Sequence, residues 1–218
     1  MKPPPSQSSQ LLPALFRNFD AEQRLHVLHL GPARQDTLDF FSTRRCRLHI
    51  VDLFAELPLP AEEDTSHGIT AHLRELLQLP TATVFDICLF WDLFNYLDAT
   101  AMQALIEILS PCIGETTVAH GFSMHNPRTP EQPVLYGIHD ADVISIRDRP
   151  AAVPGYCPHS QQRLLDLLQC FRMERTVLLA DKRLELLLRA RTQLESAPEA
   201  PVSAATGYAI RQGRRANA

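Results

Sequence analysis

The chain lacks the features that mark membrane, secreted and metal-bound proteins. None of its apolar runs approaches the roughly 20 residues of a membrane-spanning helix. Its five cysteines are odd in number and form no Cys-x-x-Cys pair, which argues against a disulfide framework and a structural zinc site. The first residues combine consecutive prolines with a short apolar patch, so no signal peptide is expected. We therefore expect a cytoplasmic protein with no membrane segment and no metal.

The chain has no excess of positive charge either. The net charge of −4 gives no strong signal for nucleic-acid binding. The few arginines at residues 211–215 would bind phosphate only weakly, and a solubilising tail is the simpler interpretation. Residues 1–10 are rich in Pro, Ser and Gln, and residues 196–218 are rich in Ala and Pro and then basic, so both are predicted to be disordered. A single domain is expected over residues 11–195.

Strand-like and helix-like segments alternate along this domain. Short apolar runs predict strands at residues 24–30, 47–51, 85–90, 116–122, 141–146 and 176–180. Helical spacing predicts an N-terminal helix over residues 11–19, helices between the strands with Asp98 and Ser160 as N-caps, and a last helix lined by Leu184, Leu187 and Leu188. The alternation predicts an α/β fold, a doubly wound, Rossmann-like and mostly parallel sheet with helices on both faces.

Three predicted strand ends carry residues that point to a ligand. Gly31 follows the first strand, Asp52 the second, and Trp91 with Asp92 the third. Ligands of open α/β sheets bind beyond the carboxyl ends of the strands. A glycine there permits close approach of the backbone, an acid can hold two ribose hydroxyls, and a tryptophan N–H suits the edge of a cleft. The sequence therefore predicts a nucleoside site at one edge of the sheet.

At these strand ends the sequence resembles the class I S-adenosylmethionine (SAM)-dependent methyltransferases. The first strand of that family ends in an acid-x-Gly-x-Gly-x-Gly turn, which aligns with His-Leu-Gly-Pro-Ala-Arg-Gln at residues 29–35. Gly31 is retained. His29 takes the place of the acid, and Ala33 and Gln35 take the places of the other two glycines. The glycine-rich motif is therefore degenerate.

The resemblance implies a cofactor site and a missing strand. Asp52 aligns with the family's ribose-binding acid, and Leu53 lies where an apolar residue contacts adenine. Trp91 and Asp92 would line the cleft near the transferred methyl group. The family's third strand, with its adenine-binding acid, has no equivalent, because only residues 80–84 are available for it. The cofactor-binding residues implied are His29, Gly31, Ala33, Asp52, Leu53, Trp91 and Asp92.

The resemblance also implies a reversed C-terminal strand. The last two strands of the family form a reversed pair that flanks one helix. Residues 141–146 and 176–180 fit these strands, with a helix over residues 160–170 between them.

Two functions of different classes stay open. The first is a SAM-dependent methyltransferase acting on a small molecule, since direct methyl transfer needs mainly positioning. No catalytic residue is assigned; His120 and His125 could reach the site as general bases, but structural histidines are the simpler interpretation. The second is a non-catalytic binding or interaction protein that has lost SAM, because His29 offers no negative partner for the ammonium group. A NAD-linked oxidoreductase is disfavoured, since the same glycines are missing from its motif.

Each candidate residue also has a structural explanation. Gly31 is a common turn residue, and Asp52 is suited to capping the loop that follows it. Trp91 and Tyr96 fit core packing, and Asp92 fits a cap of a short turn. The three-dimensional arrangement of these residues decides between the two explanations.

Overall fold

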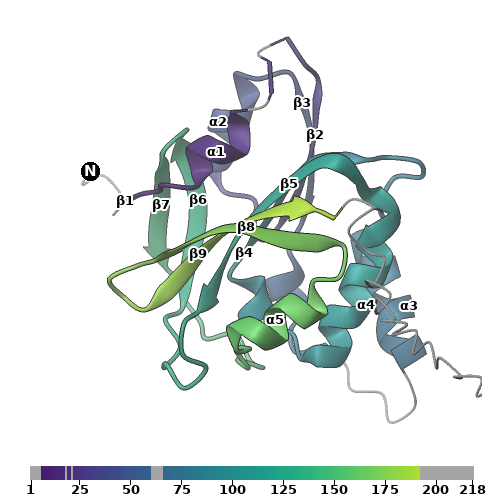
Figure 1. Ribbon diagram of the computed structural model, residues 1–218, viewed down its shortest axis with the longest axis vertical. Helices are drawn as coiled ribbons and strands as arrows, with labels where there is room; N and C mark the ends of the chain where they lie inside the picture. The colour runs from purple at the N-terminus through teal and green to yellow at the C-terminus, as the bar shows by residue number, and fades with distance from the viewer. Residues whose placement is uncertain (1–5, 18, 21, 60–65, 192–218) are drawn as a thin grey trace, which may run out of the picture.

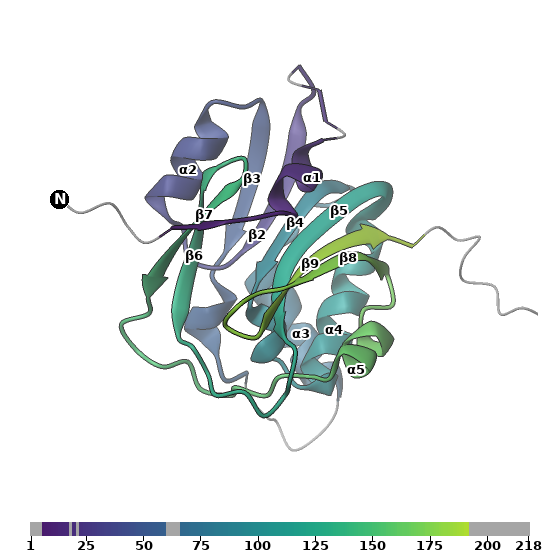
Figure 2. The same ribbon diagram turned by 60° about the vertical axis from the view of Figure 1, so that its left-hand side comes forward.

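The structure is a computed structural model that describes residues 6–17, 19–20, 22–59 and 66–191 (Figures 1 and 2). The predictions for the C-terminal tail, residues 196–218, lie outside this range. No helix among the described residues is long and apolar enough to span a membrane.

A six-stranded sheet forms the centre of the molecule, in the order β3-β2-β4-β5-β9-β8. β3, β2, β4 and β5 pair in parallel, and β9 runs antiparallel to both β5 and β8. Its strands are β2 (Leu25–Leu30), β3 (Cys46–Val51), β4 (Phe85–Trp91), β5 (Ile113–Met124), β8 (Phe171–Leu178) and β9 (Arg183–Ala190). The predicted Rossmann-like, mostly parallel sheet is confirmed, and so are its first four strands.

Helices cover one face of this sheet, and helices with a second sheet cover the other (Figure 1). Alternate residues of β4 serve the two faces: Cys88 and Phe90 belong to one core, and Ile87, Leu89 and Trp91 to the other. The first core is completed by α3 (Ser66–Leu77), α4 (Ala99–Leu109) and α5 (Gln161–Leu167), and the second by α1 (Leu12–Phe16) and α2 (Gln35–Ser42).

Short 3-10 turns and the predicted caps complete the helical part. The turns are η1 (Leu53–Glu56), η2 (Leu93–Asn95) and η3 (Ser110–Cys112). Asp98 accepts the Ala101 amide at 2.8 Å, and Ser160 accepts the Arg163 amide at 3.3 Å. Both predicted N-caps are confirmed.

The second sheet differs from the prediction. β1 (Ser6–Ser8), β6 (Val134–Asp140) and β7 (Val143–Asp148) form an antiparallel sheet in the order β1-β7-β6, which lies against α2 (Figure 2). β7 corresponds to the predicted strand at residues 141–146, but it belongs to this small sheet and not to the central one. β1 falls within residues 1–10, for which the composition predicts disorder. β1 is ordered because it pairs with β7, which lies far along the sequence: Ser6 pairs with Ser145.

The C-terminal hairpin also corrects the prediction. Leu184, Leu187 and Leu188 were expected on a helix, but they lie in β9, and the reversed pair is β8 with β9. Both faces of β9 are buried, with Leu186 and Leu188 in one core and Leu187 in the other. A strand buried on both faces reads as a continuous apolar run, which periodicity alone does not distinguish from a helix.

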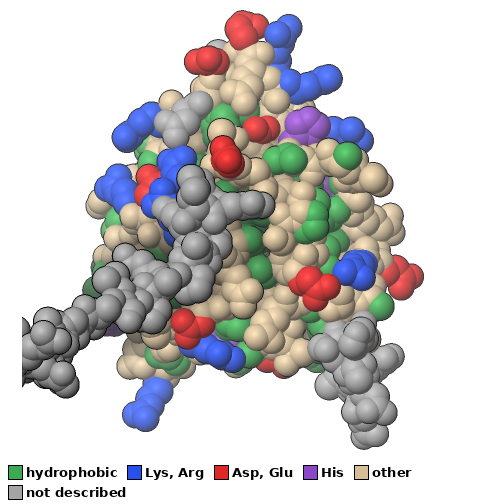
Figure 3. Space-filling view, turned by 45° about the vertical axis from the view of Figure 1, so that its right-hand side comes forward, with side chains coloured by type: hydrophobic (Ala, Val, Ile, Leu, Met, Phe, Trp, Pro, Cys, Tyr) green, Lys and Arg blue, Asp and Glu red, His purple; other side chains and the backbone are tan. Residues whose placement is uncertain are grey.

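The surface visible in Figure 3 shows hydrophobic side chains in small groups among polar and charged ones. Three large hydrophobic side chains are exposed within the described part of the chain: Leu38, Val84 and Leu178. They come from α2, from the segment before β4 and from β8, so they do not form one patch.

Candidate functional site

The ends of β2, β3 and β4 bring the predicted residues to one edge of the central sheet. β2 pairs in parallel with β3 on one side and β4 on the other, so the three carboxyl ends are aligned. The Gly31 amide donates to the Val51 carbonyl at 2.8 Å, and a Cβ on Gly31 would lie 3.1 Å from Trp91 Cδ1. Gly31, Asp52, Trp91 and Asp92 are called the strand-end site below.

The indole of Trp91 fills the space against Gly31. Trp91 is 2% exposed, and its ring lies 4° from parallel with that of Tyr136, with 5.7 Å between centroids. Tyr136 stacks in turn on Phe122. The backbone φ of Trp91 is 52°, in the left-handed region that bulky residues rarely adopt. The indole therefore packs between the two sheets instead of facing solvent.

His29, which stands where the methyltransferase family has an acid, is buried and neutral. Its Nε2 lies 3.2 Å from the Pro32 carbonyl oxygen and 3.4 Å from Trp91 Nε1. Because an indole N–H only donates, these two contacts require different tautomers, and one hydrogen bond forms at a time. Burial lowers the pKa of His29 to about 4. The position thus supplies no negative charge for an ammonium group.

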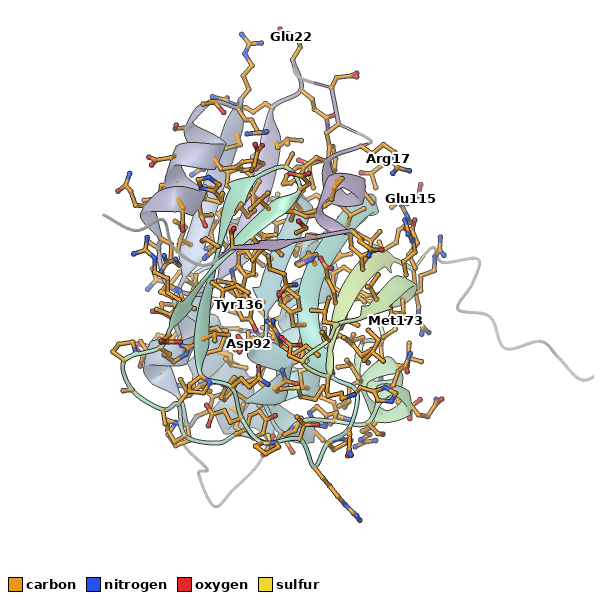
Figure 4. The ribbon with its side chains drawn as sticks, turned by 90° about the vertical axis from the view of Figure 1, so that its left-hand side faces the viewer. Arg17, Glu22, Asp92, Glu115, Tyr136 and Met173 are labelled. Atoms are coloured by element: carbon orange, nitrogen blue, oxygen red, sulfur yellow. The ribbon has the colours of Figure 1, made fainter. Side chains whose placement is uncertain are left out.

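Asp92 is a buried acid beside a buried arginine. Asp92 is 5% exposed, and burial raises its pKa to about 7, although the charge of Arg149 opposes the rise. Arg149 Nη2 lies 3.9 Å from Asp92 Oδ1, which is too long for a hydrogen bond. Asp92 and Tyr136 lie close together in the interior (Figure 4). Burial is the main cause that raises the pKa of the Tyr136 phenol, and the Asp92 carboxyl raises it further.

Asp52 has a buried oxygen facing the same edge. Its Oδ1 has no hydrogen-bond partner among the described residues. Burial raises the pKa of the Asp52 carboxyl, and a hydrogen bond from the Phe54 backbone and the charge of Arg149 oppose this rise. The following residues, Leu53 and Phe54, are buried in the core below α3 and α4. Leu53, predicted to contact adenine, is therefore a core residue next to the acid.

Unsatisfied polar atoms gather at this edge. Buried polar groups are nearly always hydrogen-bonded to protein or to water, and an unpaired one needs an explanation. Within the described residues, the buried atoms without a partner at this edge are His29 Nδ1, Asp52 Oδ1, Asp92 Oδ1, Asn95 Oδ1 and Arg149 Nε. Three of them are acceptor oxygens: Asp52 follows β3, Asp92 follows β4, and Asn95 ends the turn η2 after β4. Such a group is suited to a polar ligand that carries hydroxyl or ammonium donors.

The start of α2, which follows the degenerate turn, is covered by the small sheet. Ser145 of β7 hydrogen-bonds to Asp36, and the Ile138 amide donates to Thr37 Oγ1 at 3.0 Å. A Cβ on Gly137 would lie 2.8 Å from Asp36 Cγ, so this glycine allows β6 to approach the helix. Asp36 is therefore engaged and does not stand in for the missing acid. Ala33 is exposed on the turn.

A cavity of about 290 Å³ lies beside η2. Tyr96 lines it, and the Tyr96 ring contacts the Phe54 ring with 5.6 Å between centroids. The Tyr96 hydroxyl donates to Glu131 Oε1 at 2.9 Å. The lining residues are Pro58, Leu59, Ile69, Tyr96, Leu97, Asp98, Ala101, Gly155 and Cys157. This volume is at the lower end of the range for small-molecule sites.

Of the two histidines considered as general bases, His120 packs edge-on against Trp91, with 6.2 Å between ring centroids, but it is held by another carboxylate. His120 is fully buried, with Nε2 2.8 Å from Glu185 Oε1, and Ser9 also bonds to that carboxylate. His125 is exposed after β5. In the part of the chain that the structure describes, no three His, Cys, Asp or Glu residues are grouped so as to bind a metal.

The sequence did not reveal the residues that the small sheet adds to the site. Tyr136 lies within β6 and Arg149 follows β7, both more than 40 positions after Asp92 in the chain. No local signal marks them, since their place depends on how the small sheet folds over the central one. The local sign of an additional strand is the run of mostly apolar residues at the start of Val134–Asp140.

No family model matches the chain, and no curated protein matches it. Among solved structures it is similar to the 1,6-didemethyltoxoflavin-N1-methyltransferase of Burkholderia thailandensis with bound S-adenosylhomocysteine, at 14% identity over 84% of this chain and 78% of that one, with a TM-score of 0.44. A SAM-dependent methyltransferase of Clostridium acetobutylicum matches at 14% identity over 76% and 83%, TM-score 0.44.

The mitomycin 7-O-methyltransferase MmcR matches at 14% identity over 83% of this chain and 53% of that one, TM-score 0.45, so the chain spans about half the length of that protein. These likenesses concern the course of the backbone and assign no activity to this chain.

Proposed function

We propose that the chain is a SAM-dependent methyltransferase of a small molecule and that its cofactor binds at the strand-end site. The observation that carries the proposal is the group of unpartnered acceptor oxygens, Asp52 Oδ1, Asp92 Oδ1 and Asn95 Oδ1. Leaving buried acceptors unsatisfied is costly, about 1–3 kcal/mol for each group. A nucleoside with vicinal hydroxyls and a cationic side chain offers donors and positive charge to these acceptors.

Each residue of the proposed cofactor site has a different role. Asp52 accepts hydrogen bonds from the ribose hydroxyls, as a carboxylate at the end of the second strand is placed to do. Asp92 and the stacked rings of Trp91 and Tyr136 supply a negative charge and aromatic faces, both of which attract a cation. Bound SAM supplies an electrophilic methyl group, and the protein positions donor and acceptor and excludes water.

The residues near Gly31 fit the methionine part of SAM less well than Asp52 fits its ribose. This favours a second candidate function. His29 is neutral, and the Trp91 indole lies against Gly31 where close approach of a ligand is expected. A methyltransferase-like protein that binds a nucleoside without transferring a methyl group accounts for these two features. Both candidates use Asp52.

Calorimetric titration with SAM and with S-adenosylhomocysteine tests the proposal. Asp52→Asn is expected to weaken binding about 10- to 150-fold, the worth of a hydrogen bond to a charged group. Asp166→Asn, an exposed acid on α5, is the matched control and is expected to bind like the wild type. Formation of S-adenosylhomocysteine from SAM with a set of small acceptors then separates transfer from binding alone. If neither compound binds the wild type at millimolar concentration, the methyltransferase proposal is wrong, and an interaction protein that has lost SAM is the function left open.

A further inference from the structure

Arg149 supplies a positive charge to the strand-end site from outside the central sheet. It follows directly after β7, and its side chain is 8% exposed. The guanidinium lies over the Phe54 ring, 4.3 Å from the ring centroid, and its Nη2 lies 3.9 Å from Asp92 Oδ1. Its charge opposes the burial-induced pKa rise of both Asp52 and Asp92. The guanidinium therefore lies near both acids that the proposed cofactor would use.

The contacts of this guanidinium are weak for a buried arginine. Nη2 donates to the Val134 carbonyl at 3.1 Å, whereas Nε has no hydrogen-bond partner in the described ranges. A guanidinium carries five N–H donors, and a buried one is normally held by paired, short bonds to carboxylates. The separation from Asp92 exceeds such a bond. Arg149 thus lies beside the acids without a hydrogen bond to Asp92, held by Phe54 and the Val134 carbonyl.

The charge of Arg149 also matches that of the proposed ligand. Two buried carboxyls with unpartnered oxygens are stabilised by a nearby cation, and in the ligand-free protein Arg149 is that cation. SAM would bring its own cation to the same acids. The two cations repel each other in a site with little water, so each weakens the binding of the other there.

We propose that Arg149 is a specificity-determining residue that occupies the strand-end site in the free protein and competes there with the nucleoside. The inference rests on the proposed function. Entry of SAM displaces the guanidinium from Phe54 and Asp92, and the bound cation then replaces its charge. Because Arg149 belongs to the connection after β7, it can withdraw while β2, β3 and β4 keep their pairing.

Removal of the competing side chain is expected to strengthen binding. Arg149→Ala removes a desolvated contact with an aromatic ring, so the affinity for SAM is expected to rise roughly 3- to 30-fold. Arg149→Gln keeps a donor for the Val134 carbonyl while removing the charge, and it serves if the Ala variant does not fold. Arg147→Ala, an exposed arginine of the same strand, is the matched control and is expected to bind like the wild type.

The measurement is calorimetric titration of the full chain with SAM, with thermal unfolding to verify folding. Tighter binding in the Arg149 variants, or binding in them alone, supports the inference. Equal or weaker binding in the variants than in a wild type that binds SAM overturns the inference and leaves the proposed function in place. Absence of binding in the wild type and in all variants overturns both.

Discussion

The role of Gly31 is open to a direct test, because its packing and its ligand-binding roles predict different results for Gly31→Ala. The added Cβ would lie 3.1 Å from Trp91 Cδ1 and 3.6 Å from both Trp91 Nε1 and His29 Nε2. The first distance is shorter than an ordinary van der Waals contact, so the indole must shift by a few tenths of an ångström. The indole is confined by stacking on Tyr136, which makes the shift costly.

The expected cost is that of an overpacked core, about 1–3 kcal/mol in the free energy of unfolding. For a chain of this size this corresponds to a decrease in Tm of about 2–12 °C. Urea unfolding followed by circular dichroism measures the free energy, and a thermal scan gives the Tm. The slope of the urea transition is expected to stay unchanged, since the same surface is exposed on unfolding.

A double-mutant cycle assigns the effect to the indole. In a Trp91→Ala background the indole is gone, so Gly31→Ala is expected to cost clearly less, with a coupling of at least about 0.5 kcal/mol. An unchanged stability of Gly31→Ala, together with weaker SAM binding, would refute the packing argument. Gly31 would then be required for approach of the ligand.

Two further results are expected. Asp92 has a pKa of about 7 in the folded protein against 3.8 for the free group, so the folded protein binds this proton more tightly. As pH rises from about 4 to 7, the free energy of unfolding of the wild type should therefore fall relative to that of Asp92→Asn, by at most about 1.4 kcal/mol per pH unit. Parallel pH profiles of the two proteins would contradict this. Glu185→Gln disturbs a fully buried acceptor shared by His120 and Ser9, so it should lower the free energy of unfolding in urea by about 1–3 kcal/mol. The control, Glu107→Gln at an exposed position, should change it by less than about 0.5 kcal/mol. Equal effects of the two changes would show that the buried network contributes nothing.

Local patterns were sufficient for the parallel half of the fold. β2, β3 and β4 are compact apolar runs that end at a glycine or an acid, and parallel pairing then aligns those ends. Gly31, Asp52 and Asp92 could therefore be placed at one edge from the sequence. The caps at Asp98 and Ser160 were predictable for the same reason, because they depend on residues three positions apart.

Long-range pairing could not be predicted in this way. The register of β1 with β7 joins Ser6 to Ser145, and nothing in either segment specifies the other. The direction in which Trp91 points is also non-local, because it depends on Tyr136 of the small sheet. Arg149 reaches the site only after that sheet has docked. The acids of the site were thus visible in the sequence, while the groups that surround them were not.

The position of β9 has a consequence for how the chain folds. β9 is the last strand among the described residues, yet it lies inside the sheet, between β5 and β8. A protein shortened before Arg183 would lose an interior strand and expose the unpaired backbone edge of β5, a known template for aggregation. Strands brought together from distant parts of a sequence also slow folding. During synthesis the central sheet cannot close until β9 has left the ribosome, so the nascent chain depends on its final strand for solubility.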